Sequence, residues 1–273
     1  MAFAAKGRFF AAVATALIVT AGAAQAAAGC GNNSAGFSTW VEQYKQEAQA
    51  QGVGSRGINA LDTVNYATKT INADRNQKSF KYSLDKFMQV RGGQTIISRG
   101  KAQKAQNAAL FANIEKRYGV PAGPLIAIWG METGFGSFMG NQHTLSAVTT
   151  LAYDCRRPEY FRDQLNAALK LIDNGTLAPN AIGAMHGEIG QTQFLPLNVL
   201  RYGADGDGNG RIDMVRSKAD ALASTANFLR GHGWQAGAGY QPGQPNYGAI
   251  QGWNAASVYQ QAIAIIGARI DGE

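Results

Sequence analysis

Hydrophobic positions after residue 36 recur with the period of an α-helix. Phe37, Trp40, Val41 and Tyr44 occupy positions i, i+3, i+4 and i+7, which predicts an amphipathic helix over 37–51. Similar patterns and helix-favouring composition predict further helices at 82–90, 100–118, 123–133, 144–152, 158–174, 191–202, 217–231 and 254–269. Alternating strands of useful length are scarce. The pattern therefore predicts a mainly α (α+β) fold, with a small irregular β region near 183–216.

Turn-forming residues separate these predicted helices. Gly119 precedes Pro121 and should end one helix, and Gly134 and Gly136 should end the next. The polar segment 52–98 reads mostly as turns, and the Gly- and Pro-rich segment 236–248 as a loop.

The first residues are typical of an export signal. Lys6 and Arg8 precede an uncharged apolar run from Phe9 to Ala24, which is too short for a comfortable membrane span. We therefore assign 1–28 to a signal peptide. Acylation of Cys30 is the alternative to simple cleavage; it is less favoured because no apolar Leu precedes that cysteine and Gln25 interrupts the run.

Composition narrows the function classes. The 273 residues are 45% hydrophobic and 16% charged, which supports a packed core and excludes disorder as the main state. Two cysteines cannot supply a zinc-finger or iron–sulfur framework. In an exported chain, Cys30 and Cys155 instead favour a disulfide. The net charge of +7 comes without a dense Lys/Arg stripe, so we predict no nucleic-acid binding.

The first candidate for chemistry is Glu132. It shares one helical face with Leu125, Ile128 and Trp129, where desolvation favours the protonated carboxyl that a general acid requires. A buried glutamate satisfied by an arginine or by backbone amides is the equal alternative.

A second candidate cluster spans 187–196. The amides of Gln191 and Gln193 beside Phe194 suit a polyhydroxylated, amide-bearing ligand such as an N-acetylated sugar. Simple capping of a helix N-terminus explains the same residues without a ligand.

A third cluster resembles the first half of an EF-hand loop. Asp205, Asp207 and Asn209 would supply side-chain oxygens, Gly210 the sharp turn and Arg211 a backbone carbonyl. The usual closing glutamate is replaced by Arg216, and an Asp/Asn/Gly turn without a metal is the alternative.

Several motifs occur together in a fixed order. They are 118–121 (YGVP), 129–136 (WGMETGFG), 156–161 (RRPEYF), 190–196 (GQTQFLP) and 205–210 (DGDGNG). In these motifs the chain resembles the lytic murein transglycosylases of the membrane-bound lytic transglycosylase B type, glycoside hydrolase family 103. The resemblance runs from about Phe37 to Arg269.

The resemblance implies a lysozyme-like catalytic domain that cleaves the β-1,4 bond between N-acetylmuramic acid and N-acetylglucosamine, with a 1,6-anhydro product. Glu132 falls on the family's catalytic glutamate, acting as acid and then base. The family's paired arginines fall on Arg156 and Arg157, and its substrate-contacting glutamine falls on Gln193. Its cleft-lining aromatic positions fall on Trp253 and Tyr259, for which ordinary core packing is the equal alternative. The carboxylate that closes its cation loop falls on Asp220, so a structural calcium is expected.

The chain also departs from the family pattern. Glu188 is an extra carboxylate near the expected cleft, where it could tune Glu132, bind a sugar hydroxyl or act as a base for water. Ala184 and Phe228 stand where the family carries a serine and a tyrosine.

The resulting organisation is one module, 29–273. Its N-terminal helical part is 29–115, and its lysozyme-like core is 116–273 with the cation loop near 203–220. We expect a periplasmic monomer that acts on peptidoglycan glycan strands without a catalytic cofactor; partners in cell-wall synthesis or secretion stay unidentified. A hydrolytic muramidase and a noncatalytic peptidoglycan-binding protein remain the alternative functions.

Overall fold

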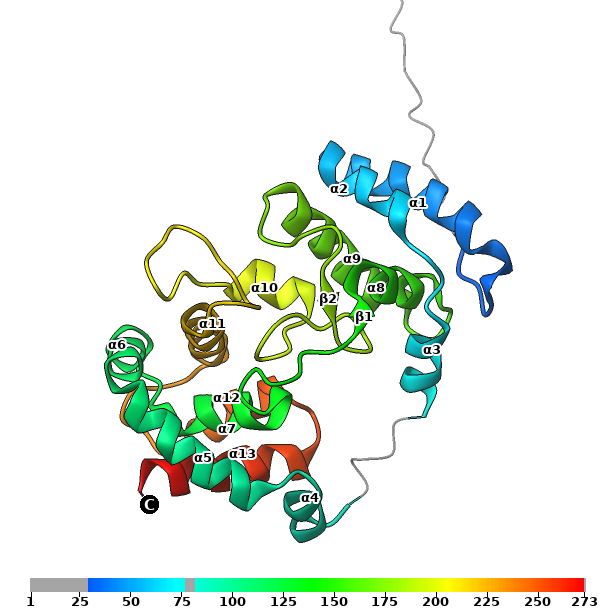
Figure 1. The fold of residues 1–273 in the computed structure, drawn as a ribbon. Coiled ribbons are helices and arrows are strands. Elements are labelled where there is room, and N and C mark those ends of the chain that lie inside the picture. The colour runs from blue at the N-terminus through cyan, green and yellow to red at the C-terminus, as the bar shows by residue number, and fades with distance from the viewer. Residues whose placement is uncertain (1–28, 77–81, 273) are drawn as a thin grey trace, which may run out of the picture.

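The computed structural model describes residues 29–76 and 82–272, so the predicted signal peptide lies outside the described residues. In chain order the helices are α1 (Phe37–Ala50), α2 (Ser55–Ala60), α3 (Thr68–Arg75), α4 (Leu84–Val90), α5 (Gly93–Gln106), α6 (Ala108–Tyr118), α7 (Ala122–Thr133), α8 (Thr144–Tyr153), α9 (Pro158–Asp173), α10 (Pro196–Tyr202), α11 (Lys218–Gly231), α12 (Tyr247–Trp253) and α13 (Ser257–Asp271) (Figure 1). Short 3-10 helices cover Ser34–Gly36 and Leu61–Thr63. Strands β1 (Gln142–His143) and β2 (Ile182–Gly183) pair antiparallel.

The predicted mainly α fold with a small β region is confirmed. The strongly periodic segments gave helices close to their predicted bounds, as in α1, α7, α8, α9 and α11. The weakly patterned segment 52–98 was predicted wrongly, because it contains α2, α3 and the first turns of α5. The predicted loop 236–248 likewise contains the start of α12, and the helix expected from 191 begins only at Pro196.

Helix α7 is the central element of the core. It packs against α5 and α13, and every residue of it except Glu132 is buried. A helix that is apolar on all sides fits only in such an interior position. Glycines allow the close approach, because a Cβ on Gly123 would lie 2.3 Å from the Gly267 carbonyl oxygen of α13.

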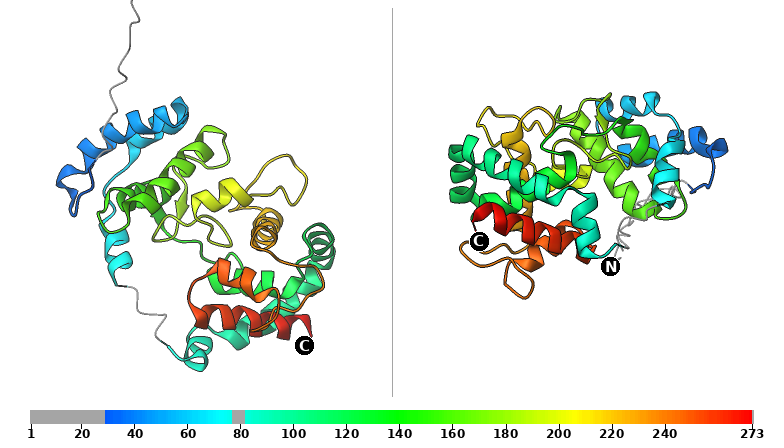
Figure 2. Two further views of the ribbon diagram at one scale, coloured as in Figure 1. Left: turned by 180° about the vertical axis from the view of Figure 1, so that it is seen from behind. Right: turned by 60° about the horizontal axis from the view of Figure 1, so that its bottom comes forward.

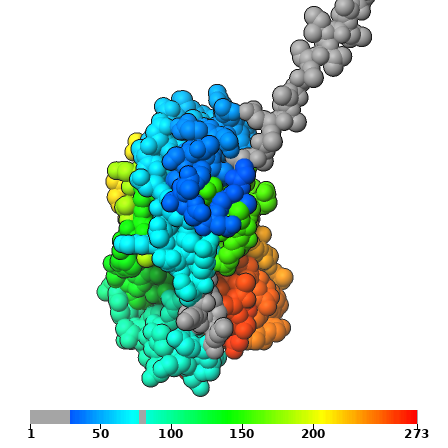
Figure 3. All heavy atoms as spheres, turned by 90° about the vertical axis from the view of Figure 1, so that its right-hand side faces the viewer, coloured from blue at the N-terminus to red at the C-terminus, as the bar shows by residue number. Residues whose placement is uncertain are grey.

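The remaining helices form two groups around this core. In Figure 1 and in the reverse view of Figure 2, α1–α3 lie at one end of the molecule beside α8 and α9, and α4, α5 and α13 lie at the other. The face in Figure 3 shows the same division, with the N-terminal segment in blue and cyan at one end and the segments in teal and orange at the other. No helix within the described residues is long and apolar enough to cross a membrane.

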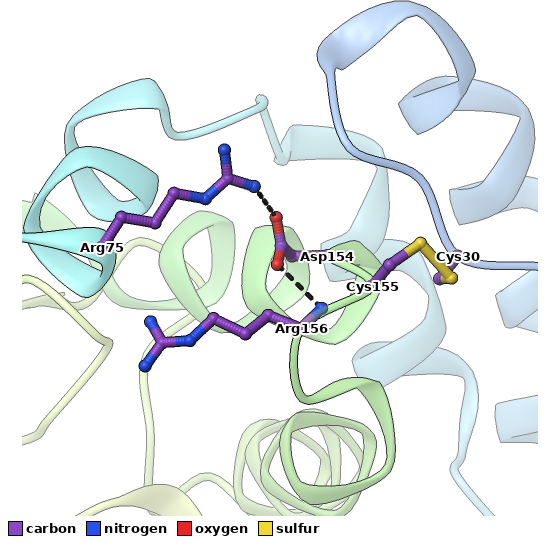
Figure 4. Close-up of a disulfide and its surroundings, with 5 residues drawn as sticks. All are labelled: Cys30, Arg75, Asp154, Cys155 and Arg156. Atoms are coloured by element: carbon purple, nitrogen blue, oxygen red, sulfur yellow. Dashed lines mark hydrogen bonds and ion pairs between the residues drawn. A yellow bond between two sulfur atoms is a disulfide. The ribbon is translucent and has the colours of Figure 1, made fainter.

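A disulfide fastens the start of the described chain to the middle of the sequence. The predicted Cys30–Cys155 bond is present, with a Cα–Cα distance of 5.0 Å (Figure 4). Next to it, the Gly31 N–H donates to the Tyr153 carbonyl at 2.9 Å. Asp154 accepts the Arg156 N–H at 3.0 Å and pairs with Arg75 at 2.6 Å (Figure 4). The bond therefore lies beside the chain segment that carries Arg156.

Removal of this disulfide should lower stability without changing the fold. The bond closes a loop with a sequence separation of 125 residues. Loss of such a constraint on the unfolded chain costs about 4–5 kcal/mol. We expect the C30S/C155S variant to melt about 10 °C below the oxidised wild type in calorimetry. The reduced wild type should melt with the variant, and equal melting of oxidised wild type and variant would contradict this account.

Candidate active site

Glu132 is the second-last residue of α7, and it is the one residue of that helix with exposed surface. Gly134 ends the helix in the left-handed conformation, with φ 59°. The main chain therefore turns away directly after the carboxylate, leaving it at a solvent-accessible edge of the core.

Two hydrogen-bond donors from the C-terminal helices hold this carboxylate. The Tyr259 hydroxyl of α13 donates to Oε1 at 2.7 Å, and the Trp253 indole N–H of α12 donates to the same oxygen at 3.2 Å. Among the described residues no hydrogen bond engages Oε2, and no ion pair involves Glu132. The arginine-paired glutamate considered from sequence is therefore wrong.

The electrostatic surroundings make Glu132 a proton donor near neutral pH. Burial raises the pKa of Glu132 to about 7, against the lowering effect of the hydrogen bonds from Tyr259 and Trp253 and of the Arg91 charge. The negative charge of Glu188 raises it further. A carboxyl with this pKa can give up a proton and take one back at physiological pH.

Arg91 was missed by the sequence analysis. It directly follows α4, and its guanidinium lies 5.8 Å from the centroid of the Tyr259 ring and 5.4 Å from that of Phe87. No sequence motif marks it, because its proximity to Glu132 arises from packing of α4 against α13.

The 187–196 cluster divides into one partly exposed residue, Gln193, and two buried ones, Gln191 and Phe194. Gln193 is partly exposed with φ 55°, and its amide donates to the Gly190 carbonyl at 2.8 Å. Such a backbone conformation in a non-glycine residue is strained and is common at functional sites.

Gln191 and Phe194 were predicted to bind substrate, and the structure contradicts both. Gln191 is buried; it accepts the Trp129 indole N–H at 3.1 Å and donates to the Val215 carbonyl at 3.0 Å. Phe194 is also buried, with its ring 5.3 Å from that of Trp253. Both side chains are taken up by hydrogen bonds and packing in the core. Tyr259, also predicted to contact substrate, is buried as well, and its hydroxyl bonds Glu132.

Arg156 and Arg157 form an arginine corner, which is joined to His186 and Glu188 through Asp74. Both guanidiniums bond to Asp74, a buried carboxylate on α3, while roughly half of each side chain stays exposed. Asp74 was not recognised from sequence, because it lies on a short helix within a segment read as turns.

Glu188 belongs to the same charged network. The His186 main-chain N–H donates to Glu188 Oε2 at 2.9 Å, and the His186 ring Nδ1 lies 3.1 Å from Oε1. The other ring nitrogen lies 3.8 Å from Asp74 Oδ1. Burial would raise the pKa of Glu188, but these contacts outweigh it and lower the pKa, so the group is ionised at neutral pH.

The EF-hand-like loop brings its acidic residues together. Ligand atoms of Asp205, Asp207 and Asp220 all lie within 4.8 Å of one another. The side-chain oxygen of Asn209 accepts the Arg211 N–H at 2.9 Å. Asp220 is fully buried at the start of α11 and accepts the N–H groups of Gly206 and Asp213. Three clustered carboxylates repel one another, and a hard cation with oxygen ligands fits this set of donors.

Comparison with known proteins gives consistent matches. A family model described as the transglycosylase SLT domain matches residues 36–244. The membrane-bound lytic murein transglycosylase B of Escherichia coli (strain K12) is 36% identical over 138 residues, which are 47% of this chain and 38% of that relative. The chain thus matches well under half of that relative's length.

Solved structures extend the likeness over most of the chain. SltB3 from Pseudomonas aeruginosa, in complex with NAG-anhNAM-pentapeptide, superposes with a TM-score of 0.80 at 29% identity, covering 86% of this chain and 80% of that one. Slt35 from Escherichia coli, in complex with calcium, superposes with a TM-score of 0.76 at 21% identity, covering 89% and 96%. The second likeness concerns the fold alone.

Substitution of Tyr259 by phenylalanine should raise the pKa of Glu132 above its value of about 7. The hydroxyl stabilises the ionised carboxylate, and its removal favours the protonated form. Infrared or ¹³C NMR titration of the carboxyl groups would measure the shift. The Y240F variant, which removes a hydroxyl bonded to Asp271, is the matched control. A Y259F titration that coincides with wild type would refute this assignment.

Proposed function

The chain belongs to the transglycosylase SLT domain family, and on that premise we propose that it is a peptidoglycan lytic transglycosylase. The proposed reaction cleaves the β-1,4 bond between N-acetylmuramic acid and N-acetylglucosamine and leaves a 1,6-anhydro-N-acetylmuramic acid end. The observation that carries this proposal is Glu132, a partly exposed carboxyl with a pKa of about 7 at the end of a buried helix.

One carboxyl is sufficient for this reaction. Protonated Glu132 gives its proton to the glycosidic oxygen as the bond from that oxygen to muramic C1 breaks, and the N-acetylglucosamine leaves with a free hydroxyl. The muramic C6 oxygen then forms a bond to C1, and its proton returns to Glu132. Because the nucleophile is part of the substrate, no protein carboxylate has to attack the sugar.

The two hydrogen-bond donors to Glu132 determine which of its oxygens exchanges the proton. Tyr259 and Trp253 both bond Oε1. They therefore hold the carboxyl plane and leave Oε2 to exchange the proton with substrate. Burial raises the pKa of the Tyr259 hydroxyl well above its ordinary value, so it stays a donor throughout.

Substrate would be positioned by the partly exposed groups around Glu132. We assign glycan or peptide-stem contacts to Arg156 and Arg157, whose guanidiniums are fixed by Asp74, and to Gln193. The complex of the related SltB3 with NAG-anhNAM-pentapeptide supports a substrate of this kind.

The same features weigh against the two alternatives. A hydrolytic muramidase needs a base for water, and the lowered pKa of Glu188 makes that carboxylate a weak base at neutral pH. A noncatalytic binding protein would not require a carboxyl with a pKa of about 7.

We place the protein in the periplasm as a monomer acting on glycan strands. The disulfide supports an oxidising compartment. It also occupies the sulfur of Cys30 that a lipid anchor would need, which supports simple cleavage of the signal peptide.

A structural calcium ion would be held by Asp205, Asp207 and Asp220, with further oxygens from Asn209 and the Arg211 carbonyl. The ion would neutralise the clustered carboxylates and fix the loop against the start of α11. Catalysis itself needs no cofactor in this proposal.

Replacement of Glu132 by glutamine should abolish turnover but keep binding. General acid–base catalysis is typically worth about 10²–10⁴-fold, so we expect at least a hundredfold loss. Mass spectrometry of muropeptides released from purified sacculi measures it, and pelleting with sacculi measures binding. The wild-type product should be lighter than a hydrolysed one by one water. Activity of E132Q within about tenfold of wild type would exclude Glu132 as the acid.

Calcium should stabilise the wild type and not a variant of the loop. We expect millimolar calcium to raise the melting temperature of the wild type by several degrees, since an ion that binds only the folded state stabilises it. D207N removes an exposed ligand and should lose this response. D62N, which changes an exposed carboxylate outside the loop, is the control. An equal response of D207N and wild type would contradict the assigned ligands.

A further inference from the structure

Glu188 is a second carboxylate near Glu132, and neither the resemblance nor the proposed reaction assigns it a role. It lies on the loop between β2 and α10, and its charge acts on Glu132. The next residue, Ile189, pairs with Phe194 through N–H···O bonds of 2.7 and 3.0 Å. The Phe194 ring contacts Trp253, whose indole donates to Glu132. These contacts fix the Glu188 segment against the group that holds the catalytic carboxyl.

The Glu188 side chain is 22% exposed, and its position is fixed by two contacts. Each of its oxygens faces a nitrogen of His186, one on the main chain and one on the ring. This geometry holds both oxygens of the carboxylate while part of the side chain stays exposed.

His186 is in turn held from its other side. Its ring lies between Glu188 and Asp74, and Asp74 also receives Arg156 and Arg157. The contacts therefore run from the two arginine guanidiniums to the Asp74 carboxylate, then to the His186 imidazole and the Glu188 carboxylate. The hydrogen bonds from His186 offset the cost of the partly buried Glu188 charge, and through Asp74 they connect it to the arginine corner.

The charged and titratable groups around the two carboxylates come from several elements. Glu132 faces Tyr259 of α13, Arg91 after α4, and Glu188 itself. Besides His186, the Glu188 charge acts on Tyr160 of α9. Arg157 is the nearest of the corner arginines to that ring, at 5.9 Å.

A carboxylate held in this way is suited to one electrostatic role. With both oxygens accepting hydrogen bonds it is neither a proton donor nor an efficient base. Glycosidic bond cleavage passes through an oxocarbenium-like transition state, which places positive charge on the sugar ring. A fixed negative charge beside the reacting sugar stabilises that state more than the neutral substrate.

We propose that Glu188, held by His186, is the charge that stabilises the cationic transition state of cleavage at Glu132. This rests on the proposed function, because it assumes a glycosidic bond broken at Glu132. Glu188 itself exchanges no proton and forms no bond, so the atoms of the reaction balance as stated above.

The test is the isosteric variant E188Q, assayed for kcat, KM and pH dependence on purified glycan strands. We expect kcat to fall about tenfold to a hundredfold with KM within about threefold. Loss of the neighbouring negative charge lowers the pKa of Glu132, so the alkaline limb of the kcat profile should move to lower pH. E188D, which restores the charge, should recover part of both effects. The control E115Q removes one exposed carboxylate on α6 and should match wild type.

The outcomes separate this proposal from the proposed function. A kcat of E188Q within twofold of wild type, with an unchanged alkaline limb and native melting, would overturn the role of Glu188. The proposal would also be overturned if the wild type released a hydrated product and E188Q an anhydro one, because Glu188 would then be a base for water. A wild type that yields only hydrated product contradicts the transglycosylase proposal, whereas a loss of kcat in E188Q with an unchanged product would still support the charge role.

Discussion

The structure depends on the burial of one carboxyl at the end of an apolar helix. Every residue of helix α7 except Glu132 is buried, and Glu132 is partly exposed. An ionised carboxylate in such a place is costly. The fold offsets that cost in two ways. The pKa of Glu132 is about 7, so the carboxyl can be protonated at neutral pH, and Tyr259 and Trp253 donate hydrogen bonds to it. Burial raises the pKa and the two hydrogen bonds lower it, and the result also lets Glu132 donate a proton near neutral pH.

That balance requires helices distant in sequence to meet at one point. The donors to Glu132 stand 121 and 127 residues after it. Helix α13 can place Tyr259 there because it packs closely on α7, where a side chain at Gly123 would collide with it. Core packing in this protein is therefore part of the chemistry, since it sets both the solvation and the partners of the acid.

The charged side chains around Asp74 are organised by a similar principle. Asp74 is buried, and its charge is matched by Arg156 and Arg157. The disulfide at Cys155 is adjacent in sequence to this pair, and it ties the segment to the start of the described chain. Each carboxylate oxygen of Asp74 accepts a charge-assisted hydrogen bond from one arginine, which fixes the two long side chains. The arginines thereby present a rigid cationic surface.

The sequence by itself determined the parts of the protein that depend on local pattern. Periodic apolar positions predicted α1 and α7, the glycine after Thr133 predicted where α7 ends, and an acidic residue on an apolar face identified Glu132. The division at residue 115 stays a prediction. Only the tertiary structure decided that Gln191 and Phe194 face the core, that Asp74 and Arg91 belong to the site, and that His186 fixes Glu188. Local pattern assigns a residue to a face, whereas burial and charge partners depend on which distant face packs against it.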